Sequence, residues 1–371
     1  MDMPLTLSLP ARINILGNPG DGNEGDFATV SAAVDIRAGA SIESAEGICF
    51  EHTGQENGVP LQLPCRFPFV YNGKYDLLKG AVNRLARFSP EFREKVSRQG
   101  VHIRVWSHVP RQSGLGGSSL FVLLALAGLR AHYELDSKVH NDYILGELAQ
   151  QVEEQELGIA CGFADRYVPI FGGLAYLDYR GKIHHTEIKT EPLVTYERLD
   201  SFVDDLPLVA AMTGVRHDSA DVHGRMRPRY VQEYDAWQAE GGKMPAMVRF
   251  MSSAWETAWR GKIALLEKDL ETFGDLMNEN HRIVDEMMNY CGFSDGAGWA
   301  NNLFIHAARE NGALGAKLTG AGGGGSVFAL VRPGDEKKIM QVWRNLAKDN
   351  GLSEAKIYRL RIARRGLVIR T

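Results

Sequence analysis

The stretch Pro110-Arg-Gln-Ser-Gly-Leu-Gly-Gly-Ser-Ser119 follows a strand-like run, Val101–Val109, and opens the strongest helical pattern in the chain, Ser118–Tyr133. Glycine adopts positive φ and lets a ligand approach the backbone without steric cost. Free N–H groups at a helix start, together with the helix dipole, favour an anion. The stretch therefore predicts a phosphate-binding loop. A turn before an ordinary helix capped by its two serines would give the same local pattern.

Glycine is concentrated in four windows, 12–26, 110–119, 158–173 and 312–326, which hold 4, 3, 4 and 7 of the 40 glycines. Such bunching favours loops that turn sharply or lie against a ligand. The densest window contains Lys317-Leu-Thr-Gly-Ala-Gly-Gly-Gly-Gly-Ser326, between a helical and a strand-like run. A ligand close to the backbone would explain this segment, and a structural turn is the alternative.

Two of these windows also match G-x-G-x-x-G, the pattern of dinucleotide-binding loops, at Gly20–Gly25 and Gly320–Gly325. Glycine-rich sequence satisfies this pattern by chance, and the residues after Gly25 favour a strand instead of the helix that the motif requires. No Gly-Lys in the chain is followed by Ser or Thr, so the Walker A motif is absent. A nicotinamide-dependent oxidoreductase is therefore the weaker hypothesis.

The composition is that of an ordinary globular protein: 371 residues, 44% hydrophobic and 24% charged, enough for two domains. A net charge of −4 argues against a general nucleic-acid binder. The four cysteines, far apart and without a CxxC pair, argue against a disulfide framework or a zinc site and favour a reducing cytoplasm. No apolar run suggests a signal peptide or a membrane span. We expect a cytoplasmic protein without nucleic-acid or membrane partners, either a monomer or a homodimer.

Periodicity predicts an α+β fold, because strands and helices are intermixed without strict alternation. Strands are predicted at Leu5–Leu16, Thr29–Ser44, Gly47–His52, Val101–Val109, Gly173–Tyr179, Leu208–Met212, Ser326–Val331 and 356–364. Helices are predicted at Ser118–Tyr133, Asn141–Leu157, 228–260, 261–290, 299–312 and 334–349. A polar stretch at 185–205 favours a domain boundary that separates residues 1–195 from residues 196–371.

Acidic residues follow the second predicted helix. The glutamates of Val152-Glu-Glu-Gln-Glu-Leu-Gly158 resemble a solvated helix end. Asp165 differs, because it is the only acid between Glu156 and Asp178 and its neighbours are mostly apolar. A carboxylate there needs a partner. It either forms a buried ion pair, with Arg12 or Arg166, or orients and deprotonates a substrate hydroxyl.

A basic cluster lies at His223-Gly-Arg225-Met-Arg227-Pro-Arg229, in a chain whose net charge is negative. Guanidinium groups bind carboxylate or phosphate with two hydrogen bonds, which makes the cluster a candidate clamp for an acidic substrate. A helix surface covered by salt bridges is the alternative.

Three motifs, taken in order, resemble the signature motifs of the GHMP kinases, the superfamily of galactokinase, homoserine kinase, mevalonate kinase and phosphomevalonate kinase. They are Pro10-Ala-Arg12-Ile-Asn-Ile-Leu-Gly17, the loop 110–119, and Gly320-Ala-Gly-Gly-Gly-Gly-Ser326. The segment Phe273–His281 is similar to a helix that these kinases carry between the second and third motifs. The resemblance implies a two-domain GHMP kinase fold, with an N-terminal domain like ribosomal protein S5 domain 2 and a ferredoxin-like C-terminal domain. ATP and substrate would meet in the cleft between them.

The resemblance also implies a role for individual residues. Asp165 matches the catalytic aspartate, and Arg12 would keep it ionised and stabilise developing charge. The ATP phosphates would contact Pro110, Gly114, Leu115, Gly116, Gly117, Ser118, Ser119, Gly322 and Gly323. Mg²⁺ would be held by Ser118 or Ser119 together with Glu154. The substrate side would comprise Asn18, Asp21, Gly322, Arg225 and Arg227.

Within the superfamily, the chain most resembles the glucuronokinases. The similarity rests on Leu16-Gly-Asn-Pro-Gly-Asp21, the loop 110–119, Glu156-Leu-Gly-Ile, Asp165-Arg166 with Gly172-Gly173, and Ser219-Ala-Asp-Val-His223. It implies an ATP-dependent sugar 1-kinase that acts on glucuronate. Kinases for galactose or a heptose, and a non-catalytic module that binds sugar and ATP, are the alternatives.

Overall fold

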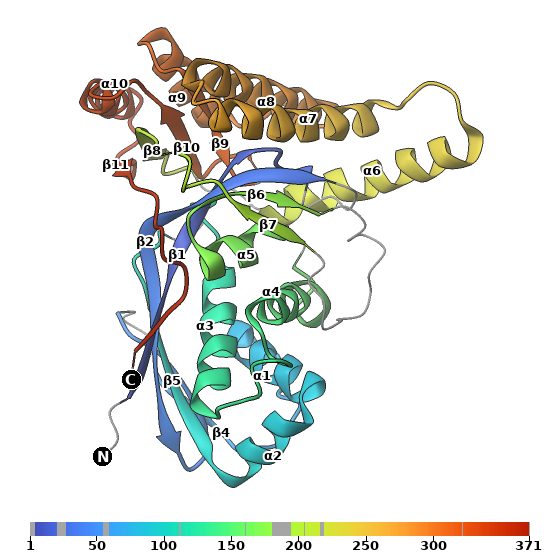
Figure 1. Ribbon diagram of the computed structural model, residues 1–371, viewed down its shortest axis with the longest axis vertical. Coiled ribbons are helices and arrows are strands. Elements are labelled where there is room, and N and C mark those ends of the chain that lie inside the picture. Colours follow the sequence, from blue (N-terminus) through green and yellow to red (C-terminus); the bar gives the residue numbers. More distant parts are fainter. Residues whose placement is uncertain are drawn as a thin grey trace.

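The computed structural model describes residues 4–20, 27–54, 59–110, 113–159, 161–179, 194–203, 205–215, 219–320 and 322–370 (Figure 1). The chain forms two sheets with helices packed against each. Both long N-terminal strands run between the two halves of the molecule, and the C-terminal segment returns beside them (Figure 1). The predicted α+β class is confirmed.

The larger sheet has eight strands and is built around two long ones. Its order is β12 (Val368–Arg370), β1 (Leu5–Leu16), β2 (Ala28–Ala45), β5 (Gly100–Ser107), β3 (Ile48–His52) and β4 (Leu61–Leu63). The other half of β2 pairs with β6 (Leu174–Asp178), which pairs with β7 (Thr195–Arg198). Only β3 and β5 are parallel among these pairs. Strand β2 begins at Ala28, three residues after Gly25, so a strand follows this window where a dinucleotide loop would need a helix.

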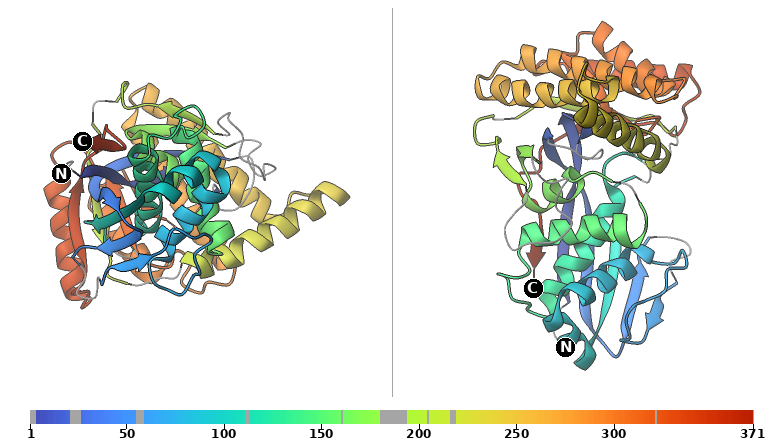
Figure 2. Two further views of the ribbon diagram at one scale, coloured as in Figure 1. Left: turned by 90° about the horizontal axis from the view of Figure 1, so that it is seen from below. Right: turned by 90° about the vertical axis from the view of Figure 1, so that its right-hand side faces the viewer.

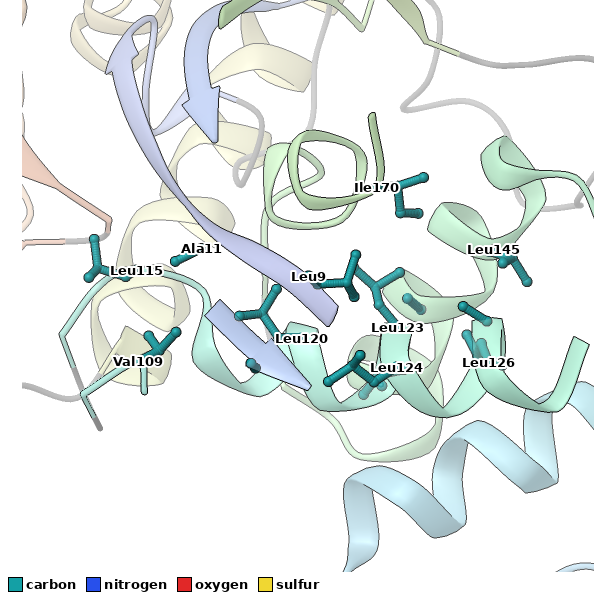
Figure 3. Close-up of a cluster of buried hydrophobic side chains, with 14 of the residues drawn as sticks. Leu9, Ala11, Val109, Leu115, Leu120, Leu123, Leu124, Leu126, Leu145 and Ile170 are labelled. Carbon is teal, nitrogen blue, oxygen red and sulfur yellow. The ribbon is translucent and has the colours of Figure 1, made fainter. Parts of the chain in front are cut away.

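Helices cover one face of this sheet, with α3 (Gly117–His132) at the centre of the layer (Figure 1). The others are α1 (Asp76–Phe88), α2 (Pro90–Arg98), α4 (Asp142–Gln151), a π-helical turn over Val152–Glu156 and α5 (Ala164–Phe171). Helix α3 is apolar around its circumference and buried, as such a helix must be. In Figure 3 its leucines lie against Leu9 of β1, and Leu115 and Val109 extend the same cluster to the preceding loop.

The smaller sheet is antiparallel, in the order β11 (Lys356–Leu360), β8 (Leu208–Met212), β10 (Ser326–Leu330) and β9 (Gly315–Thr319). Strand β8 is followed by α6 (Ser219–Glu240), α7 (Ala246–Leu266), α8 (Leu270–Tyr290) and α9 (Trp299–Glu310), and α10 (Glu336–Asp349) precedes β11. Numbered along the chain, the sheet order is 4-1-3-2 with a helical segment after the first and third strands, which is the ferredoxin-like arrangement. Helix α6 projects from the body of the molecule (Figure 2).

The predicted elements differ from the structure in both halves. In the first half, the helices α1, α2 and α5 and the short strands β4 and β7 were not predicted. Two long helical patterns, 228–260 and 261–290, form three helices, because Gly241 and Gly242 adopt positive φ and Pro245 follows. Strand β9 was not predicted, although it pairs along its whole length with β10. The proposed boundary after residue 195 stays a prediction, since residues 185–193 of the polar stretch lie outside the described residues. In the parts of the chain described, no helix is long and apolar enough to cross a membrane.

Candidate active site

The predicted phosphate loop leads from β5 into α3, and its apolar residue anchors it to the core. Leu115 is only 3% exposed, a burial that stabilises by roughly 1.5–3 kcal/mol. Its carbonyl accepts a hydrogen bond from the backbone N–H of Arg12 at 3.4 Å. Pro110 and residues 113–119 are described, whereas Arg111 and Gln112 are not. The loop is therefore held to β1 through the backbone of Leu115.

Helix α3 does not begin as the ordinary helix capped by Ser118 and Ser119 that was the alternative to a phosphate-binding loop. The residue before it is Gly116, with φ +79°, and no side chain caps the helix. Gly117 is its first residue, and the hydroxyls of Ser118 and Ser119 point elsewhere. Among the described residues, the first N–H groups of the helix therefore have no side-chain acceptor, which is the arrangement that suits an anion.

The phosphate loop and the loop after β9 are in backbone contact. Gly114 has φ +72°, and a Cβ there would lie 2.7 Å from the carbonyl oxygen of Thr319. A Cβ on Gly320, at φ +83°, would lie 3.0 Å from the Cα of Gly114. Neither position has room for a side chain, so glycine is required at both. Two of the glycine windows, some 200 residues apart in sequence, thus meet at one place.

The two further predicted glycines of that loop have separate surroundings. Gly322 has φ +97°, and a Cβ there would come within 2.6 Å of the Met288 sulfur. The N–H of Gly323 donates to the carbonyl of Ala297 at 2.9 Å. Part of the glycine excess in this window therefore serves packing against α8 and the segment before α9.

Arg12 of β1 and Asp165, in the first turn of α5, form an ion pair. Both Nε and Nη2 of Arg12 lie 2.5 Å from Asp165 Oδ1, and its Nη1 donates to the Gly114 carbonyl at 2.5 Å. The arginine side chain is 5% exposed and the aspartate side chain 16%. Of the two partners left open for Asp165, the structure selects Arg12. The pair also joins the aspartate to the phosphate loop.

A second carboxylate faces the start of α3, and it is Glu153. Its Oε1 accepts from Ser118 Oγ and its Oε2 from Ser119 Oγ, each at 2.8 Å. Arg166 also donates to Oε2, and both side chains of this ion pair are almost fully buried. Two hydroxyls and a carboxylate are hard oxygen donors of the kind that Mg²⁺ prefers.

The prediction that the Glu154 carboxylate lies with the two serines was wrong by one residue, because Glu153 occupies that place. Glu154 instead accepts hydrogen bonds from Gln150 and from Arg227 of α6. The reason is the π-helical turn over Val152–Glu156, in which Leu157 N–H donates to Val152 O, five residues back. Adding a residue to the turn changes which glutamate faces α3. In the described parts of the chain, no group of three or more His, Cys, Asp or Glu side chains could hold a metal.

Comparisons with known proteins agree with this geometry. The model of the GHMP kinase N-terminal domain matches residues 76–173, and that of the GHMP kinase C-terminal region matches residues 303–349. A galactokinase from Thermococcus kodakarensis is 33% identical over 271 residues, which cover 67% of this chain and 69% of the relative. The chain belongs to the GHMP kinase family.

Other relatives and solved structures of this family match more of the chain. The probable glucuronokinase 2 of Arabidopsis thaliana is 28% identical over 345 residues, or 90% of this chain and 87% of the relative. The Lactococcus lactis galactokinase structure, complexed with galactose, superposes with a TM-score of 0.77 at 18% identity, covering 98% and 95% of the two chains. The predicted two-domain GHMP kinase fold is confirmed, and the protein is a small-molecule kinase of a family that uses ATP.

The arginine cluster of this GHMP kinase lies on helix α6. Two of its arginines pair with acidic residues of the same helix, and the third pairs with a residue outside it. Arg225 bonds to Asp221 at 2.9 Å and Arg229 to Glu233 at 3.3 Å, each four residues away on the same helix. These two follow the alternative of a salt-bridged surface. Arg227 is different: it reaches across to Glu154 and to the Cys161 carbonyl, and its side chain is 17% exposed. The cluster does not converge on one point.

The predicted substrate residues near the N-terminus cannot both be placed. Asp21 lies outside the described residues. Asn18 is 1% exposed, and its side chain is already engaged: Oδ1 accepts from Lys317 Nζ at 2.6 Å, and Nδ2 donates to the Gly320 carbonyl at 3.5 Å. Asn18 therefore connects the loop after β1 to β9 and to the loop that follows β9, and its contact with substrate stays a prediction.

Two residues of the site, Glu153 and Lys317, were missed by sequence reasoning. Glu153 is next to the predicted Glu154, and the π-helical turn decides which of the two faces the serines. Arg166 was considered as a partner of Asp165, whereas the structure pairs it with Glu153. Lys317 opens the densest glycine segment, yet a single lysine in a strand carries no signal of burial. Its position immediately before Leu318-Thr319-Gly320 was the available indication.

Proposed function

We propose that this kinase transfers the γ-phosphoryl group of ATP to the anomeric hydroxyl of a monosaccharide, and that the substrate is a sugar acid, glucuronate first. The observation that carries the proposal is the Arg12–Asp165 ion pair, bonded to the carbonyl of Gly114 in the phosphate loop. It brings a partly exposed carboxylate beside a loop suited to phosphates. That is the juxtaposition a hydroxyl-to-phosphate transfer requires.

The reaction follows from these residues. The sugar hydroxyl gives its proton to the carboxylate of Asp165, and its oxygen forms a bond to the γ-phosphorus. The bond from that phosphorus to the bridging oxygen of ATP breaks, and ADP leaves with the electron pair. Arg12 fixes the orientation of the carboxylate and places positive charge beside the transferred group. Positioning and charge stabilisation account for most of the catalysis in such transfers.

Magnesium is the metal whose chemistry the donor set of Ser118, Ser119 and Glu153 fits. Mg²⁺ takes one or two carboxylates, hydroxyl oxygen and substrate phosphates, and it keeps several waters. When bound, it would neutralise charge on the phosphates. Arg166 holds the Glu153 carboxylate in place, so that the serine hydroxyls and the carboxylate stay together. The proposed ligand set therefore replaces Glu154 by Glu153.

The preference for an acid rests on Arg227, which is the arginine of the cluster nearest the site residues. It contacts the Cys161 carbonyl, one turn before Asp165 in the chain, and its partner Glu154 adjoins Glu153. A guanidinium there could exchange Glu154 for a substrate carboxylate, a charge-assisted bond of the kind that discriminates acids from neutral sugars. The glucuronokinase relatives, which match 90% of the chain, support the same choice.

A neutral sugar is the second candidate, because the galactokinase from Thermococcus kodakarensis is 33% identical to this chain. A panel of glucuronate, galacturonate, galactose, a heptose and mevalonate, assayed with ATP and Mg²⁺, separates the candidates. We expect kcat/KM for glucuronate to exceed that for galactose by about tenfold or more, as one charge-assisted bond allows. An equal or higher value for galactose, a heptose or mevalonate would overturn the acid preference.

A further inference from the structure

Lys317, in the middle of β9, is a fully buried lysine, and all the hydrogen-bond acceptors of its ammonium among the described residues are neutral groups. It is 0% exposed. Its Nζ donates to the Asn14 carbonyl at 3.3 Å, to Asn18 Oδ1 at 2.6 Å and to the Leu318 carbonyl at 3.0 Å. An ammonium has three donors, and all three are used. No described carboxylate forms a salt bridge with it.

A second buried lysine shows what is unusual here. Lys79 of α1 is 2% exposed, and its Nζ donates to the Val70 carbonyl at 3.1 Å and to Asn72 Oδ1 at 2.6 Å. Its third acceptor, however, is the carboxylate of Asp76 at 3.1 Å. No carboxylate in the described part of the chain compensates Lys317 in this way, and burial lowers its pKa to about 7. A methionine of similar length would occupy the space without a buried charge, so stability by itself does not account for a lysine at 317.

The partners of Lys317 belong to the two different sheets. Asn14 is in β1 of the larger sheet, and Asn18 lies in the loop that follows it, while Lys317 and Leu318 are in β9 of the smaller sheet. Two further bonds run alongside: Asn14 N–H to Thr319 Oγ1 at 3.2 Å, and Asn18 Nδ2 to the Gly320 carbonyl at 3.5 Å. The ammonium is thus the centre of a polar junction between the sheets.

On both strands, residues next to this junction belong to or contact the candidate active site. Along β1, Arg12 precedes Asn14 by two residues and therefore points to the same face of the sheet. Along β9, Thr319 and Gly320 follow and make the backbone contact with Gly114. A shift of one sheet against the other would move the Arg12–Asp165 pair relative to the phosphate loop. Displacements of about 1 Å cost up to about 10²-fold in rate.

We propose that Lys317 is a positioning residue, which holds β1 and the loop after it in register with β9 and thereby aligns the Arg12–Asp165 pair with the phosphate loop. The role concerns the kinase reaction itself and does not depend on which sugar is the acceptor. It predicts that loss of the ammonium lowers turnover more than it weakens ATP binding, and that both connected segments loosen together.

Lys317→Met and the matched control Lys79→Met test this role. Each removes a buried ammonium with three bonds, but Lys79 lies on α1 and none of its bonds joins the two sheets. For Lys317→Met we expect kcat to fall about tenfold or more, with the Kd for ATP, measured by calorimetry, changed less than about threefold. Lys79→Met is expected to change the melting temperature while kcat stays within about twofold. Lys317→Arg keeps donors at the junction and should recover part of the lost kcat.

Amide hydrogen exchange supplies a readout that needs no substrate. Lys317→Met should speed exchange in both 12–20 and 316–320, including the Asn14 amide, whereas Lys79→Met should leave both segments unchanged. If no sugar were phosphorylated by the natural protein, the proposed function would fail while this measurement would still decide the role of Lys317.

If Lys317→Met fails to fold, Asn18→Ala provides a second test. It removes the Asn18 side chain, which accepts a hydrogen bond from the Lys317 ammonium, from the loop after β1. It should reproduce the exchange and kcat effects, and the double variant should be scarcely worse than either single one. Natural kcat and natural exchange in a folded Lys317→Met protein, or in Asn18→Ala if the former does not fold, would overturn the proposal. Equal losses of kcat in Lys317→Met and Lys79→Met would overturn it as well.

Discussion

The Arg12–Asp165 pair beside the phosphate loop and the Arg225–Asp221 pair on the surface of α6 consist of the same residue types. They differ in how far apart the two partners lie in the sequence. Arg12 and Asp165 are 153 residues apart, and the fold alone brings them together. Arg225 and Asp221 are four residues apart on one helix, with half-exposed side chains. The Arg12–Asp165 pair is mostly buried, whereas the side chains of the helix pair are about half-exposed to solvent.

This difference separates functional charge from ordinary surface charge. Exposed pairs at i and i+4 contribute about 0.3–0.5 kcal/mol and satisfy one another locally. A buried pair from distant segments has lost its water, so it needs precise surroundings and can act on a ligand in a low dielectric. The concentration of arginines at 225–229 is therefore weaker evidence for an acid-binding site than a single contact, in which the Arg227 side chain extends from α6 to Glu154.

Changing Asp165 to Asn should have the largest effect. The variant keeps the shape of the side chain but removes the proton acceptor, so kcat is expected to fall by about 10²-fold or more. ATP binding should stay nearly intact, because the link from Asp165 to the described part of the phosphate loop runs through Arg12. Steady-state kinetics and calorimetry measure the two quantities. Near-normal turnover would show that the enzyme works without a base.

Glu153→Gln, compared with Glu154→Gln, tests which glutamate serves the metal. For Glu153→Gln we expect the Mg²⁺ concentration at half-maximal activity to rise about tenfold, within the usual range for altered metal surroundings. Stability should also fall by about 3 kcal/mol, because the variant breaks the buried ion pair between Glu153 and Arg166. Glu154→Gln should change neither quantity appreciably, as its partner Arg227 is partly exposed. The reverse ranking would restore the sequence-based assignment.

Arg227→Leu should act on the acceptor and not on ATP. If Arg227 binds a substrate carboxylate, KM for glucuronate should rise about tenfold while activity toward any neutral sugar is unaffected. The comparison of acid and neutral acceptors in the same preparation controls for general damage. A parallel loss on both would assign Arg227 to the Glu154 contact alone.

Arg225→Leu is the matched change on the same helix and should have the smallest effect. Its pair with Asp221 is half-exposed, and its guanidinium lies over the Phe293 ring at 4.6 Å. We expect kcat and KM within about twofold and stability within about 0.5 kcal/mol of the natural protein. A large rise in KM for glucuronate would mean that the surface pair opens to bind substrate.

Local patterns were sufficient for the strands and helices with strong periodicity. The predicted strand at Leu5–Leu16 has the observed bounds, and the predicted helix at Ser118–Tyr133 differs from α3 by one residue at each end. Helix α5, which carries Asp165, was not predicted, because its eight residues include Pro169 and sit among glycines. The residues at which helices begin and break could not be predicted, because they depend on which glycines adopt positive φ, and the sequence does not show this.

The sequence by itself determined that a glycine-rich loop follows β5 and another precedes β10, that Asp165 needs a partner, and that the motif order is that of GHMP kinases. These follow from local chemistry: glycine permits positive φ, and a lone carboxylate among apolar residues is costly. Only the tertiary structure decided that Arg12 is the partner, that Glu153 and not Glu154 faces the serines, and that Lys317 joins the sheets. Each depends on the register between segments far apart in the chain, which packing sets and local pattern does not.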